Sequence, residues 1–264
     1  RQNDYDLVVT CTDLIVQSNI RNKRLILVQE GITEPEDFIY WLVRTFHLPR
    51  VLANTAATGL SNAYDKFCVA SYGYKKHFIK KGVKPEKIIV TGIPNFDNLK
   101  TARINKFPHK HYVLVATSSI RETGKFDDRI GFLNRVKQIA GDRKIIFKLH
   151  PNEDVKRAKN EIKRVIPDAI IFTKGNTNHM IANCDVLITQ VSTVVYVGIA
   201  LGKEVYSYFD LKMLRSLQPI QNNGKSAFRI ADVCRNVIQI PLAELRKPKY
   251  KRRAIKKWLP FESQ

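Results

Sequence analysis

The chain has 264 residues, and 44% of them are hydrophobic, which is enough to bury a core and excludes an extensively disordered protein. Lysine and arginine number 45 against 24 acidic residues, so the formal net charge is +21. A charge of this sign attracts polyanions, which leaves nucleic acid, anionic lipid headgroups and phosphorylated substrates as partner classes. No apolar run reaches the roughly 18 residues that a membrane-spanning helix needs.

Apolar, β-branched runs recur along the chain and predict buried strands. They lie at 5–11, 24–29, 66–71, 87–92, 111–117, 144–150, 169–174, 185–190 and 204–209. Segments with helical periodicity lie between several of them, as at 127–140 and 154–166. This alternation predicts an α/β fold in which parallel sheets are covered on both faces by helices.

One polar and basic stretch, residues 92–111, interrupts the alternation and contains two prolines. We predict that it links two Rossmann-like domains, an amino-terminal domain at 1–105 and a carboxyl-terminal domain at 106–264. The end of the chain carries eight basic residues between 246 and 257 with no acid among them. Trp258 and Phe261 follow, and this pattern suits contact of the 246–258 tail with an anionic membrane surface.

Polar side chains follow three predicted strands of the second domain, at the point where each strand ends. Ligands of open parallel sheets bind beyond the carboxyl ends of the strands. A serine-threonine pair before a helix also predicts an N-cap, and a helix N-terminus favours an anion. The sequence therefore predicts an anion-binding site formed by Ser118, Arg121, Lys148, His150, Ser192 and Thr193.

These segments resemble the GT-B superfamily of nucleotide-sugar glycosyltransferases and UDP-N-acetylglucosamine 2-epimerases. "KLHPN" (148–152) and "CDVLITQVSTVVYVGIALGKEVYSYF" (184–209) are similar to its carboxyl-terminal, nucleotide-binding domain. "VQEGITEPED" (28–37) and "FCVASYGYKKHFIKKGVKPEKIIVTGIPNFDNL" (67–99) resemble the end of its amino-terminal domain. The superfamily's first strand and early glycine-rich loop have no counterpart here. The resemblance therefore implies an amino-terminal domain that is incomplete at its start.

Two features of the motifs narrow what the resemblance implies. UDP-sugar members commonly hold the ribose hydroxyls with a glutamate after the small-residue turn, but 193–201 contains no acid and Tyr196 lies near that place. The Lys-x-His-Pro strand end resembles transferases that use CMP- or CDP-activated donors. In those enzymes the histidine and the Ser/Thr pair contact donor phosphate, which implies the same for His150, Ser192 and Thr193. The implied activity is transfer of a sugar or polyol phosphate from a nucleotide-activated donor to a surface-polysaccharide or lipid-linked acceptor.

The chemistry of such a transfer fits these residue types. A His150 imidazolium, two hydroxyls and a helix N-terminus would stabilise the charge that develops on the leaving phosphate. We expect them to act without a metal, and we expect no cofactor besides the CMP-, CDP- or UDP-linked donor. The base for the acceptor hydroxyl should come from the acidic segment 28–37. Glu30 is the first choice there, as a carboxylate whose pKa burial would raise.

Several other interpretations stay open on the sequence. The chain could be a 2-epimerase or a non-catalytic, polyanion-binding relative with the same fold. His150 could be an ordinary strand-end residue, the Ser192–Thr193 pair a plain N-cap, Arg121 part of a solvated loop, and the acidic segment a helix N-terminus. Nucleic acid is the least favoured partner, since no RNP-like or recognition-helix motif is found. We expect a cytoplasmic protein, with the basic tail at the inner membrane face.

Overall fold

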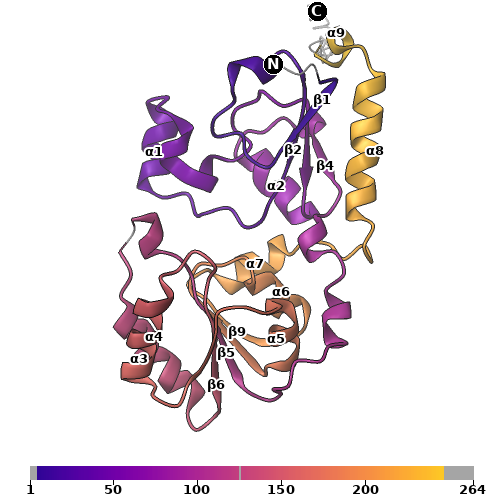
Figure 1. Ribbon diagram of the computed structural model, residues 1–264. Helices are drawn as coiled ribbons and strands as arrows, with labels where there is room; N and C mark the ends of the chain where they lie inside the picture. Colours follow the sequence, from indigo (N-terminus) through magenta and orange to yellow (C-terminus); the bar gives the residue numbers. More distant parts are fainter. Residues whose placement is uncertain (1–4, 125, 247–264) are drawn as a thin grey trace, which may run out of the picture.

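Two parallel β-sheets form the framework of the computed structural model, which describes residues 5–124 and 126–246 (Figure 1). Each of the nine predicted strands is present, and so are the two helices predicted at 127–140 and 154–166. The α/β class with two Rossmann-like domains is therefore confirmed. The two sheets lie one after the other in sequence, on either side of the linker predicted at 92–111.

The amino-terminal domain has a four-stranded sheet in the order β1-β2-β3-β4. Residues 25–27 of β2 are fully buried, as expected for an apolar strand covered on both faces. The strands are β1 (Leu7–Thr10), β2 (Arg24–Val28), β3 (Lys66–Val69) and β4 (Ile88–Val90). The helices are η1 (Ser18–Ile20), α1 (Phe38–Thr45), η2 (Arg50–Ala57), α2 (Tyr72–Lys80), η3 (Pro85–Lys87), η4 (Pro94–Phe96) and η5 (Leu99–Arg103).

The carboxyl-terminal domain has a five-stranded sheet in the order β7-β6-β5-β8-β9, so the end of β5 lies between the ends of β6 and β8. Its strands are β5 (Val113–Ala116), β6 (Ile145–Lys148), β7 (Ile170–Phe172), β8 (Val186–Thr189) and β9 (Glu204–Tyr206). Its helices are η6 (Arg121–Thr123), α3 (Arg129–Ala140), α4 (Val155–Val165), α5 (Thr177–Asn183), α6 (Val195–Ala200) and α7 (Leu211–Leu217).

Aspartate caps fix the starts of the two helices that the sequence predicted. The Asp128 carboxylate accepts a hydrogen bond from the Gly131 N–H at 3.0 Å, and that of Asp154 accepts one from the Arg157 N–H at 2.9 Å. Val136 of α3 is fully buried on the face that covers the sheet. At both helices, the capping residue therefore stands where the apolar periodicity predicts that the helix begins.

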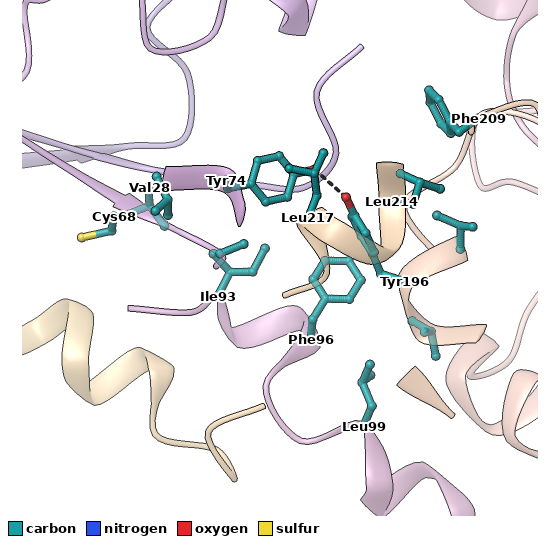
Figure 2. Packing of buried hydrophobic residues seen from close by; sticks show 14 of the residues in the cluster. Val28, Cys68, Tyr74, Ile93, Phe96, Leu99, Tyr196, Phe209, Leu214 and Leu217 are labelled. Atoms are coloured by element: carbon teal, nitrogen blue, oxygen red, sulfur yellow. Dashed lines mark hydrogen bonds between the residues drawn. The ribbon is translucent and has the colours of Figure 1, made fainter. Parts of the chain in front are cut away.

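One hydrophobic core continues from the first sheet into the second domain (Figure 2). In its middle the rings of Phe96 and Tyr196 meet edge to face, with their centroids 5.9 Å apart. The end of α7 also joins the domains, since Ser71 Oγ donates to the Leu217 carbonyl at 2.8 Å. The domains therefore contact each other through buried side chains as well as through the linker.

The chain returns to the amino-terminal domain after α7. Helix α8 (Ser226–Gln239) lies beside that domain in Figure 1, and α9 (Leu242–Leu245) follows it. The Arg24 guanidinium donates to the carbonyls of Val237 at 3.1 Å and Ile240 at 2.8 Å. The predicted division gave all of 106–264 to the second domain. Helix α8 packs instead on the first, because its apolar side, which includes Val233 and Val237, enters the core there.

The predicted basic tail lies outside the described residues from position 247 onward. Arg246 is its only described member, and its guanidinium pairs with Asp65 at 3.0 Å. Among the described residues, no helix has the length and apolar character required to cross a membrane.

Candidate active site

The carboxyl ends of β5, β6 and β8 meet at one edge of the second sheet. Beyond β5, Thr117 Oγ1 accepts a hydrogen bond from the His150 N–H at 3.0 Å, and Ser118 Oγ donates to the Val191 carbonyl at 3.0 Å. The ends of β6 and β8 lie two strand spacings apart, which is about 10 Å. The structure therefore brings His150 and the Ser192–Thr193 turn to the same edge, on either side of the end of β5.

The His150 ring is held in one orientation by its own turn. Nδ1 accepts a hydrogen bond from the Asn152 N–H at 3.2 Å. Burial, followed by the nearby Lys148 ammonium, lowers the pKa of His150 below 6.5, and the Glu122 carboxylate opposes this shift. We expected an imidazolium, but at neutral pH the ring is neutral. Because Nδ1 is an acceptor, the proton lies on Nε2, which can donate to an anion.

A buried carboxylate that the sequence reasoning missed supports this turn. The side chain of Glu153 has an exposed fraction of 0% and pairs with the Arg129 guanidinium. Glu153 also accepts from the Thr117 hydroxyl, and its own N–H donates to the His150 carbonyl at 3.1 Å. The series of contacts from Arg129 through Glu153 to Thr117 thus fixes the position of the His150 backbone. The available signal was an acid three residues after His150, immediately beyond the strand end.

Arg121 belongs to the same cluster of ion pairs as Arg129. Its guanidinium pairs with Glu161 at 2.7 Å and with Asp127 at 3.6 Å. Gln190, at the end of β8, donates to Asp127 at 2.7 Å. The charge of Arg121 is therefore already compensated by two carboxylates, and its role in donor binding stays a prediction.

Lys148 is turned toward the neighbouring strand end. Its Nζ donates to the carbonyl oxygens of Leu149 at 2.8 Å and Thr173 at 3.4 Å, and only 7% of the residue is exposed. Burial lowers the pKa of Lys148. Its nearest effect on a ligand is indirect, through the lowered pKa of His150.

The Ser192–Thr193 turn leads into α6 but caps it weakly. Ser192 Oγ accepts only a long hydrogen bond of 3.5 Å from the Val194 N–H, so the hydroxyls are not committed to a strong cap. Tyr196 is 1% exposed, and its hydroxyl lies 2.8 Å from that of Tyr74. It therefore faces the core joining the domains and does not take the place of the glutamate that the sequence lacks here.

The segment after β2 contacts this turn from the other domain. A Cβ atom added to Gly31 would lie 2.6 Å from Thr193 Cγ2, so the Thr193 side chain packs closely against the backbone at Gly31. Gln29 fixes the segment by donating to the Gly31 carbonyl at 2.8 Å and accepting from the Ala70 N–H at 2.9 Å. Glu30 lies between these contacts with an exposed side chain. The burial that we expected around Glu30 is therefore not found, because the chain leaves the sheet there.

A cavity of about 670 Å³ lies between the domains beside this contact. Glu34, Pro35 and Asp37 line it from the amino-terminal domain, and Ser118 and Val191 are among the residues on the opposite side. The Asp37 carboxylate caps α1 by accepting from the Tyr40 N–H at 2.8 Å. Of the predicted donor-binding residues, only Ser118 is in the lining of this cavity, which does not include Arg121, Lys148, His150, Ser192 or Thr193.

No family model and no curated protein matches this chain. Solved structures do. UDP-GlcNAc 2-epimerase from Neisseria meningitidis bound to UDP-GlcNAc matches with a TM-score of 0.59 at 10% identity, over 88% of this chain and 76% of that chain. Staphylococcus aureus MnaA in complex with UDP matches with a TM-score of 0.56 at 13% identity, over 86% of this chain and 65% of that chain.

The arrangement of two Rossmann-like domains and these likenesses define a GT-B type fold, which confirms the fold that the sequence motifs predicted. At such low identity the likeness shows the fold alone. The chain spans less than two thirds of the Staphylococcus aureus protein's length. The activity must therefore follow from the site residues.

Proposed function

We propose that this protein is a sugar-nucleotide enzyme that transfers a sugar or polyol phosphate from a nucleotide-activated donor to an acceptor hydroxyl. The observation that carries the proposal is the contact of Gly31 with Thr193. It sets the acidic segment at 30–37 against the edge that carries His150 and the Ser192–Thr193 hydroxyls. Glu34 and Asp37 of this segment line the interdomain cavity. In the proposal they supply the carboxylate for the acceptor, and His150, Ser192 and Thr193 at the sheet edge supply the donors for the phosphate.

The transfer would proceed by displacement. The acceptor oxygen gives its proton to a carboxylate and bonds to the anomeric carbon of a sugar, or to phosphorus where a polyol phosphate moves. The bond to the nucleotide phosphate breaks, and the electron pair stays on that phosphate. His150 would donate from Nε2 to the phosphate oxygen, and Ser192 and Thr193 would donate from their hydroxyls. Preorganised donors aimed at developing charge are the largest aid that a protein gives to such a step.

Two carboxylates compete for the role of base. Glu30 is exposed beside the Gly31–Thr193 contact, whereas Glu34 lines the interdomain cavity. We infer that Glu34 is the stronger candidate, because a base needs hydrogen-bond reach to an acceptor held in the cavity. Turnover of Glu34→Gln and Glu30→Gln separates the two. The residue that acts as base should lower kcat by at least a hundredfold on substitution, while nucleotide affinity stays unchanged.

Thermal unfolding in the presence of CMP, CDP, UMP and UDP tests the donor site. We expect the nucleotides of one nucleobase, cytosine or uracil, to raise the Tm of the protein. A ligand at 100 times its Kd stabilises the folded state by about 2.7 kcal/mol. The increase should be lost in His150→Ala and reduced in Ser192→Ala. His47→Ala is the matched control, since His47 is an exposed histidine outside this edge. A Tm indifferent to all four nucleotides would contradict the proposal and favour a non-catalytic, polyanion-binding protein.

A second candidate is epimerisation at C2 of UDP-N-acetylglucosamine. It is favoured by the acidic segment at 30–37, which faces the cleft and could exchange a proton with the sugar. The chemistry of the Neisseria meningitidis neighbour, as its name states it, is of this kind. NMR of the protein with UDP-N-acetylglucosamine distinguishes the two activities. Appearance of the C2 epimer without an acceptor would replace the transferase proposal.

A further inference from the structure

Helix α1 turns an apolar face toward solvent. Phe38, Trp41 and Leu42 share one side of the helix, since they are three and four residues apart. Phe38 is 70% exposed and Trp41 is 57% exposed, while Tyr40 and Val43 on the opposite side are buried. The outward side of an ordinary surface helix is polar, so this helix has an apolar side that nothing in the described residues covers.

Further exposed apolar side chains follow α1 along the chain, as far as the start of η2. We define the α1–η2 surface by its exposed large apolar side chains: Phe38, Ile39, Trp41, Phe46, Leu48, Val51 and Leu52. In Figure 1, α1 forms one flank of the amino-terminal domain. Seven large apolar side chains exposed within residues 38–52 are unusual for a soluble protein and mark a candidate interaction site.

This surface is held in place by buried contacts and is not the side of a loose segment. Asp37 caps the start of α1. Lys81, which is 3% exposed, donates from Nζ to the Ala56 carbonyl in η2 and lies 5.0 Å from the Tyr40 ring centroid of α1. The exposed side chains therefore project from a fixed scaffold.

The chain segment that forms the α1–η2 surface carries basic but no acidic side chains. From Phe38 to Tyr64 the sequence contains no aspartate or glutamate, whereas Arg44 and Arg50 are present. Acids precede the surface at Glu34, Glu36 and Asp37, at the cleft end of α1. The Arg44 guanidinium lies 3.4 Å from the Tyr40 hydroxyl, and that of Arg50 lies 3.4 Å from the Asp13 carbonyl, so both cations flank the apolar side chains. Apolar groups flanked by arginines suit an anionic lipid surface.

Further cations adjoin this surface through Arg50. Arg50 lines a cavity of about 710 Å³ at the amino ends of the strands, together with Arg21, Lys66, Lys84, Lys87 and Arg246. Only Asp65 and Glu86 oppose these charges in the lining. Burial, with Lys84 and Arg246 as further causes, lowers the pKa of Lys87. An anionic headgroup near Arg50 would relieve this crowding of positive charge.

We propose that the α1–η2 surface docks the protein on an anionic phospholipid bilayer. Phe38, Trp41 and Phe46 enter the interface between headgroups and acyl chains, and Arg44 and Arg50 contact lipid phosphates. Aromatic side chains beside arginines are the composition that this interface favours. The docking proposal does not depend on the proposed enzymatic activity.

Tryptophan fluorescence tests the proposal directly, because the chain has two tryptophans, Trp41 and Trp258. The Trp258→Phe variant leaves Trp41 as the only reporter. Vesicles of phosphatidylcholine mixed with phosphatidylglycerol should shift Trp41 emission to shorter wavelength and protect it from acrylamide. Vesicles of phosphatidylcholine alone should do so weakly. Co-sedimentation with the mixed vesicles but unchanged Trp41 emission would assign binding to another part of the chain and overturn the proposal.

A pair of variants gives the matched comparison. Phe38→Ser combined with Phe46→Ser should lower the vesicle partition coefficient at least tenfold, whereas Phe228→Ser should leave it unchanged. Phe228 is 69% exposed on α8, away from the α1–η2 surface. Thermal melts confirm that each variant is folded. Equal partitioning of both variants contradicts the proposal. The proposal is also contradicted if the protein does not bind vesicles and sedimentation shows a dimer that the Phe38→Ser, Phe46→Ser variant cannot form.

Discussion

The phenol oxygens of Tyr74 and Tyr196 lie 2.8 Å apart in the core that joins the two domains (Figure 2). Tyr74 belongs to α2, and Tyr196 belongs to α6, directly after the Ser192–Thr193 turn. Burial raises the pKa of Tyr74 to about 12 and raises that of Tyr196 as well. Both phenols therefore stay protonated near neutral pH, and one polar contact inside an apolar core fixes the turn relative to the amino-terminal domain.

Removing one hydroxyl of this pair should not be equivalent to removing the other. Tyr74 has Gln29 and the Thr33 backbone as further hydrogen-bonding neighbours. Tyr196 has no other partner among the described residues. We expect Tyr74→Phe to cost about 1–3 kcal/mol, since it leaves a buried hydroxyl unpaired, and Tyr196→Phe to cost less. Urea unfolding measures both, and the double variant should cost less than the sum. Equal losses would contradict this account.

The close contact between Gly31 and Thr193 predicts that a side chain at position 31 clashes with Thr193 and that a second substitution relieves the clash. Gly31→Ala should destabilise the protein by about 1–3 kcal/mol and weaken nucleotide binding, because the new methyl meets Thr193 Cγ2 and pushes the segments apart. Thr193→Ser removes that methyl and keeps the hydroxyl. The double variant should therefore recover most of the stability and binding. Urea unfolding and nucleotide titration measure the two effects, and failure of the serine to rescue would show that the clash lies elsewhere.

Nucleotide affinity should increase as the pH falls below neutrality. The free protein holds His150 neutral, with a pKa lowered chiefly by burial. A bound phosphate favours the imidazolium and raises this pKa, so binding takes up a proton, and affinity rises by at most about tenfold per pH unit. Calorimetric titration across this range measures the slope. His150→Gln cannot take up the proton and should lose this part of the dependence, while titration of the phosphate itself remains in both proteins.

The sequence was sufficient to predict the strands and the sheet edge at which the strand ends of the candidate site meet. Continuous apolar runs predicted all nine strands, and parallel topology placed the strand ends that carry His150 and Ser192 together. The contacts between distant segments could not be read from local patterns. Tyr196 pairs with a residue 122 positions away, and α8 returns to the first sheet. Glu153 was visible in the motif, but only tertiary packing shows that Arg129 and Thr117 surround it.

Lys81 should make the stability of the protein rise with pH in the alkaline range. Burial, opposed by Glu36, lowers the pKa of Lys81 from 10.5 to about 8. Between these values the unfolded chain binds more protons than the folded one, so the folded state gains about 3 kcal/mol as the pH rises. Groups whose pKa is raised on folding, such as Cys68, make the stability fall as the pH rises and so oppose this gain.

The comparison is therefore made with Lys81→Met, which lacks the titrating group. Its stability advantage over the wild type in urea should be largest below the lowered pKa and fall by about 3 kcal/mol toward pH 10.5. An advantage that stays constant with pH would mean that Lys81 remains charged in its buried position between α1 and η2.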